Sequence, residues 1–158
     1  MNMTLVLLLA VGIGIIAGLR SLTAPAVVCW MAHLHVLNLQ HSHLRFMGSI
    51  IAVAVFTLLA LAELINDKLP ETPSRVTPVP LTARILMGAL SGAAFGAAGA
   101  SSIMIAAIAG IIGALIGTFG GYQVRTRTVK ALHAPDFVIA LLEDAVAIGG
   151  GLLLASRF

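Results

Sequence analysis

Two carboxylates, Glu143 and Asp144, lie near the middle of the apolar segment 137–156. The segment otherwise has the composition of a membrane-spanning helix. An ionised carboxylate in hydrocarbon costs about 2.5–3.5 kcal/mol even on the more lenient insertion scale. A segment that served only as an anchor would not need these groups. The pair therefore predicts a polar site that faces protein or water and has a cationic partner.

Three more ionisable residues accompany apolar segments. Glu63 and Asp67 are four residues apart, so they lie on one face of a helix. The guanidinium of Arg20 stays charged in essentially any environment and needs an anion, carbonyls or water around it. In one interpretation the carboxylates handle a cation or proton and Arg20 binds an anionic group; in the other, internal ion pairs fix the helix register. The candidate site is Arg20, Glu63, Asp67, Glu143 and Asp144.

The composition indicates that these charged residues belong to a membrane protein. Of the 158 residues, 59% are hydrophobic and 9% are charged, against roughly 25% charged in soluble domains. Helices satisfy their own backbone hydrogen bonds in lipid, so we expect an all-α integral membrane protein with one domain, residues 1–158. The net charge is only +3, and the basic residues lie mainly in two loops. The predicted partner is the bilayer, and neither nucleic acid nor a cofactor is expected.

The long apolar runs predict a transmembrane bundle of about five spans. Their bounds are 4–24, 46–65, 83–98, 103–122 and 135–156. Residues 26–39 form a further run of about 21 Å as a helix, too short for a core of roughly 30 Å. We expect a re-entrant or interfacial half-helix there, with a sixth full span as the alternative. Four prolines exclude a continuous helix over 69–82.

Basic residues predict the orientation. Loops 66–84 and 123–134 each carry three Lys or Arg residues and, with two spans between them, lie on one side. The positive-inside rule places both loops in the cytoplasm and the C-terminus outside. The N-terminus is cytoplasmic with five spans and outside with six. In the five-span arrangement Arg20 falls in the outer half of the membrane.

Glycine ladders run through the third and fourth spans. Small residues at every fourth position let membrane helices approach closely. The favoured interpretation is packing within one chain, and the alternative is a homo-oligomer interface. The ladders are Gly88, Gly92 and Gly96, and Gly113, Gly117 and Gly121.

A weak internal similarity accompanies the glycine ladders. A Gly-x-x-x-Gly pair precedes basic residues in both the first and the fourth span, and a span with an acidic cluster follows each. The first and fourth spans run in opposite directions in the five-span arrangement. This similarity suggests an inverted repeat, which is typical of transporters.

Enzyme chemistry finds little support in the sequence. We find no nucleophile elbow, phosphate loop or zinc-hydrolase motif, so we do not expect an enzyme. The strongest candidate for contact with an anionic lipid or phosphate is the basic group Arg125, Arg127 and Lys130. Four histidines near the end of the short run are interpreted as interfacial residues rather than metal ligands: His33, His35, His41 and His43.

The stretch from Ala62 to Pro70, Ala-Glu-Leu-Ile-Asn-Asp-Lys-Leu-Pro, gives the chain its most specific likeness. Together with Gly-Leu-Arg-Ser at 18–21 and Leu-Leu-Glu-Asp at 141–144, it resembles domain-of-unknown-function family 4126, a family of small bacterial membrane proteins. The resemblance covers nearly the whole chain. It implies a multi-pass protein of the bacterial cytoplasmic membrane and supplies no substrate.

Three functions are compatible with these observations. The first is a small transporter or channel-like protein with a polar intramembrane site. The second is a structural or accessory membrane subunit held together by ion pairs. The third, an enzyme acting on lipid headgroups, lacks a catalytic motif.

Overall fold

The computed structural model describes residues 1–67, 76–132 and 136–158, and their regular structure is helical throughout. The elements are α1 (Met3–Leu19), α2 (Thr23–His33), the 3-10 helix η1 (His43–Gly48), α3 (Ile50–Asn66), α4 (Pro78–Ala98), α5 (Ile103–Leu132) and α6 (Asp136–Ala155). Within the described ranges, α4, α5 and α6 are long and apolar enough to cross a membrane, whereas α1 and α3 are apolar but only 17 residues long. These helices indicate a membrane protein.

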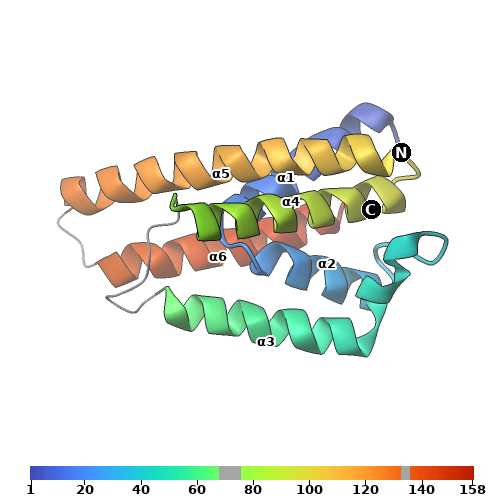
Figure 1. Ribbon diagram of the computed structural model, residues 1–158, viewed down its shortest axis with the longest axis horizontal. Coiled ribbons are helices and arrows are strands. Elements are labelled where there is room, and N and C mark those ends of the chain that lie inside the picture. Colours follow the sequence, from blue (N-terminus) through green and yellow to red (C-terminus); the bar gives the residue numbers. More distant parts are fainter. Residues whose placement is uncertain (68–75, 133–135) are drawn as a thin grey trace.

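The helices form one elongated bundle (Figure 1). Helices α1, α3 and α5 run in one direction, and α2, α4 and α6 run in the other (Figure 1). Both chain termini lie at one end. The C-terminal ends of α3 and α5 and the N-terminal ends of α4 and α6 lie at the opposite end. This arrangement agrees with the six-span alternative on one point, because the N-terminus lies at the same end as the C-terminus.

Helix α2 begins inside the bundle and returns toward the end where α1 started (Figure 1). It has 11 residues, or about 16 Å of helix, so it does not span a bilayer by itself. The expected half-helix is therefore present, but it occupies Thr23–His33 rather than 26–39.

Glycines let α1, α4 and α5 pack backbone against backbone. A Cβ placed on Gly14 or Gly18 of α1 would approach the α5 backbone closer than 3.0 Å, and one on Gly88 or Gly92 of α4 would do the same. Gly14 lies against Gly110. The ladder residues Gly113 and Gly117 of α5 meet the carbonyls of Val11 and Ile15 in the same way. The favoured prediction of packing within the chain is thus confirmed.

The same contacts bear on two alternatives. The Gly88–Gly92–Gly96 face is covered by α5, and Gly113 and Gly117 are covered by α1, so the alternative of a homo-oligomer interface through these glycines finds no support. Contact positions along α1 and α5 increase together, Gly14 with Gly110 and Gly18 with Gly117. The two helices are parallel, so an inverted repeat that relates them is wrong.

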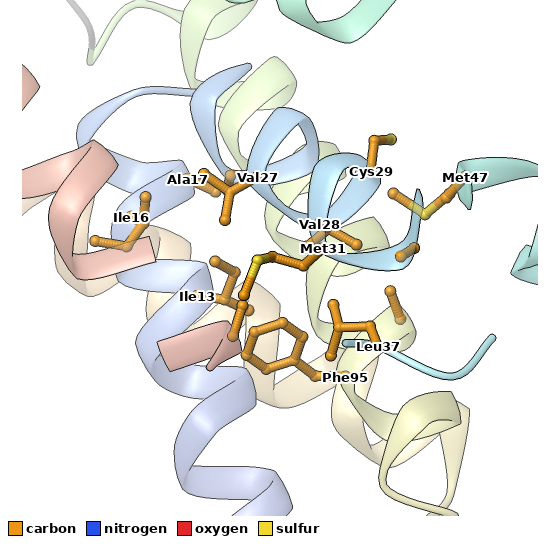
Figure 2. Packing of buried hydrophobic residues seen from close by; sticks show 14 of the residues in the cluster. Ile13, Ile16, Ala17, Val27, Val28, Cys29, Met31, Leu37, Met47 and Phe95 are labelled. Carbon is orange, nitrogen blue, oxygen red and sulfur yellow. The ribbon is translucent and has the colours of Figure 1, made fainter. Parts of the chain in front are cut away.

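Large side chains fill the space between this glycine-packed group and α2. Phe95 of α4 is fully buried and lies beside Ile13 of α1, with Met31 of α2 nearby (Figure 2). The Phe158 ring meets Phe95 edge-on, with centroids 4.8 Å apart. Helix α3, by contrast, packs chiefly on α2 and η1 and turns most of its large apolar side chains outward.

Two helix boundaries differ from the prediction for physical reasons. Helix α4 begins at Pro78 rather than at 83, because a proline in the first turn loses no intrahelical hydrogen bond. Helix α5 continues to Leu132 rather than ending at 122. Arg and Lys are good helix formers, so the basic segment leaves the apolar region without leaving the helix.

Candidate functional site at the break between α1 and α2

The break between α1 and α2 exposes backbone groups inside the bundle. Helix α1 ends at Leu19, Arg20 is extended with φ −139° and ψ 107°, and α2 begins at Thr23. Each helix end leaves amide or carbonyl groups without an intrahelical partner. Pro25 lies in the first turn of α2, where its missing N–H has no consequence.

A carboxylate from α3 satisfies the amides at this break. Glu63 Oε1 accepts hydrogen bonds from the Ser21 amide at 2.8 Å and the Ser21 hydroxyl at 2.6 Å. Its Oε2 accepts one from the Leu22 amide at 2.8 Å. A negative charge at a helix N-terminus is favoured by the helix dipole as well as by these bonds. Glu63 therefore acts as a cap for α2 that comes from another helix.

Arg20 joins three helices at the same place. Its side chain is 0% exposed, and its guanidinium forms ion pairs with Asp67 of α3 and Asp144 of α6. Nη1 donates a hydrogen bond to Asp67. Nη2 lies 2.6 Å from Asp144 Oδ1, without the angles of a hydrogen bond, and Nε has no hydrogen-bond partner among the described residues. The buried cation is thus shared between carboxylates of two helices.

Glu143, the residue before Asp144 on α6, faces a different arginine. Glu143 lies 3.5 Å from Nη1 of Arg125 on α5. Neighbouring residues on a helix point about 100° apart, so Glu143 and Asp144 reach two different neighbours. The mid-span pair consequently links α6 both to the α1–α2 break and to the C-terminal part of α5.

Residues 7–156 match the protein family described as domain of unknown function (DUF4126). The chain belongs to this family. No curated protein and no solved structure matches the chain at a significant level. Membership in DUF4126 confirms the resemblance seen in the sequence, and it leaves the function to be argued from the site.

The structure of this DUF4126 protein brings four of the five predicted site residues together directly. Arg20 contacts Asp67 and Asp144, and Glu63 lies one helical turn before Asp67. The expectation that Arg20 lies in the opposite half of the membrane from Asp67 is wrong. Helices α1 and α3 run in the same direction, so their C-terminal ends meet.

Sequence reasoning missed two contributors to the site, Ser21 and Leu22, and it assigned one buried arginine to the wrong element. Ser21 and Leu22 hold the Glu63 carboxylate largely through backbone amides. Such donors cannot be identified from the residue types in a sequence. Arg84 was assigned to loop 66–84, yet it lies in the second turn of α4 with only 3% of its surface exposed. A proline pair before an apolar run was the signal that could have placed it in a helix.

The basic group proposed for phosphate contact is divided. Arg125 faces Glu143, whereas Arg127, two residues further along α5, is exposed. Lys130 lies on α5, and Lys68 and Arg75 of the first basic loop lie outside the described residues. Arg125 and Arg127 therefore have different surroundings, and contact of this group with an anionic lipid or phosphate stays a prediction.

The histidines lie at the end of the bundle that holds the termini. His33 Nδ1 is 3.0 Å from the Gly48 carbonyl oxygen, which ties α2 to η1. His41 and His43 line a shallow depression of about 450 Å³ with Gln40, Ser42 and Arg45. In the described part of the chain, no three His, Cys, Asp or Glu side chains are grouped as a metal site.

Proposed function

We propose that this protein is a small transporter of the bacterial cytoplasmic membrane whose solute passes through the polar site at the α1–α2 break. One observation carries the proposal: a fully buried arginine at the point inside the bundle where the chain reverses between α1 and α2, shared by carboxylates of two other helices. Ionisable groups inside a membrane bundle are candidates for a functional site, and transporter sites commonly include backbone that leaves the helical conformation within the membrane. The expected orientation keeps the C-terminal ends of α3 and α5 on the cytoplasmic side.

The mechanism follows from which helix can move. Arg20 and the amides at the break belong to the α1–α2 unit, and Glu63 and Asp67 both come from α3. Helix α3 packs chiefly on α2 and η1, whereas α1 is locked to α5 through glycine contacts. A displacement of α3 would remove two acidic groups from the site together and uncover Arg20. No covalent step is involved.

Flux through reconstituted vesicles tests this function. Wild-type protein in liposomes with a trapped pH-sensitive dye is expected to move at least one member of a panel of small carboxylates and monovalent cations, above protein-free vesicles. Arg20→Gln should reduce that flux about tenfold or more if the variant is folded, because the substitution removes the buried positive charge with which the site binds its solute. Exposed Arg127→Gln is the matched control and should retain the flux. Absence of wild-type flux for the whole panel would refute the proposal.

A second candidate function is a structural or accessory subunit. The burial of the site favours it, because Arg20 is fully covered and the Asp67 side chain is only 16% exposed. In that case the ion pairs only hold helices together, and a stable membrane partner should co-purify.

Water access to α6 distinguishes the two functions. With Cys29→Ala as background, a transporter is expected to let a small charged thiol reagent label Asp144→Cys in membranes. The control Ala140→Cys lies one turn earlier on α6 and is 1% exposed, so it should stay protected. Protection of both positions in folded protein would favour the structural subunit.

A further inference from the structure

The Glu63 carboxylate occupies a position that has the features of an anion-binding site. Two successive amides, one hydroxyl and the positive end of the α2 dipole converge on its two oxygens. Backbone N–H groups at a helix N-terminus are a common site for carboxylates and phosphates. The α2 helix has 11 residues, so its dipole is developed.

The residues on either side of Ser21 and Leu22 carry buried polar groups without a hydrogen-bond partner among the described residues. Arg20 is 0% exposed and its Nε has no hydrogen-bond partner among the described residues. Thr23, the first residue of α2, is 4% exposed and its hydroxyl likewise has no partner within the described ranges. Unsatisfied buried polar atoms are rare in native structures and call for an explanation. Both groups belong to the residues that flank Ser21 and Leu22, whose amides hold the Glu63 carboxylate.

We propose that the α2 N-terminus is a binding site for a small carboxylate, and that Glu63 occupies it when the solute is absent. The inference rests on the proposed transport function and names its substrate class. The three donors reach two oxygens of one group, because one oxygen receives both Ser21 donors and the other receives the Leu22 amide, and this matches the two oxygens of a carboxylate. Glu63 lies on α3, the helix whose displacement would vacate the site.

Substitution Glu63→Ala makes the proposal testable with a defined probe. It removes the γ-carbon and the carboxylate group, which together have the same heavy atoms as acetate. Acetate should therefore fill the vacated space and accept the hydrogen bonds from Ser21 and Leu22. In detergent, we expect the Tm of Glu63→Ala to lie below that of the wild type and to rise by about 4 °C at ten times the Kd for acetate.

The controls separate site binding from general anion effects. Glu63→Gln keeps the volume of the side chain in the site, so its Tm should not respond to acetate. Sodium phosphate and sodium chloride at matched ionic strength should leave the Tm of Glu63→Ala unchanged. Trp30, the one tryptophan of the chain, donates to Thr57 of α3 at 3.0 Å. Its emission should therefore return toward the wild-type spectrum as acetate restores the α2–α3 contact.

Each outcome decides the proposal. An equal Tm response to acetate in Glu63→Ala and Glu63→Gln would overturn it. So would a Glu63→Ala protein that cannot be recovered with or without acetate while Glu63→Gln folds, because the tethered carboxylate would then be irreplaceable. Recovery of Glu63→Ala only in acetate would support it. The binding readout is independent of flux, so acetate rescue without transport would refute the transporter function and leave the carboxylate site in place.

Discussion

Replacing Arg20 by Gln is expected to lower the free energy of unfolding by about 3–5 kcal/mol, the usual cost of leaving a buried charge without its partner. The side chain is fully buried, and its guanidinium faces Asp67 and Asp144 on two different helices. Total stabilities of folded proteins are about 5–15 kcal/mol, so this change removes a large share of the stability and the thermal midpoint in detergent should fall clearly below that of the wild type.

Neutralising the partners tests the reason for that loss. The triple variant Arg20→Gln, Asp67→Asn and Asp144→Asn removes the cation and both acids together, so it should recover much of the lost stability. The measurement is the midpoint of thermal unfolding in detergent. The single change Arg127→Gln, at an exposed position of α5, should alter stability by no more than about 0.5 kcal/mol. A stable Arg20→Gln protein would show that the ion pairs contribute little to the fold.

Gly110→Ala is expected to destabilise the bundle by about 1–3 kcal/mol or more, as overpacking of a tight core does. Gly110 lies where α5 meets both α1 and α4, and an added Cβ would approach the Gly88 carbonyl closer than 3.0 Å. The obstructing atoms belong to a helix backbone, which cannot turn aside as a side chain can.

Another glycine of α5 provides the control for this change. Gly120 has nothing within 4 Å of an added Cβ. Its replacement by Ala should raise stability by about 0.5–1 kcal/mol through helix propensity alone. The two variants differ only in what the methyl group meets, so the same unfolding assay compares them directly. Equal effects at Gly110 and Gly120 would contradict the close packing of the three helices.

The sequence predicted the site better than it predicted the arrangement. Charged residues within apolar segments stand out because their cost in lipid is large, so Arg20, Glu63 and Asp144 could be selected one by one. Their partners could not be assigned, because pairing depends on which helices run parallel. The chain reverses between α1 and α2, so every later helix runs in the opposite direction relative to α1 from the one that the five-span prediction gave it. Residue types carry only a weak signal for such a reversal.

The predicted helix boundaries were wrong where polar segments had been interpreted as loops. The basic segment after Tyr122 is helical to Leu132, and the segment after Pro78 is helical from its first proline. Charge marks where a segment leaves the apolar region, whereas the end of a helix is set by backbone hydrogen bonding. The amides of Ser21 and Leu22 escaped prediction for a related reason, since backbone groups contribute to a site wherever the helix stops.

The cap on α2 has a consequence for biosynthesis. The amides of Ser21 and Leu22 receive their acceptor from Glu63, about 40 residues later in translation, and Arg20 meets Asp144 only near the end of the chain. The first helical hairpin therefore enters the bilayer with its break incompletely bonded and is completed from outside its own sequence. A chain truncated before α6 therefore lacks one of the two carboxylates that pair with Arg20, and it should be less stable than the full chain.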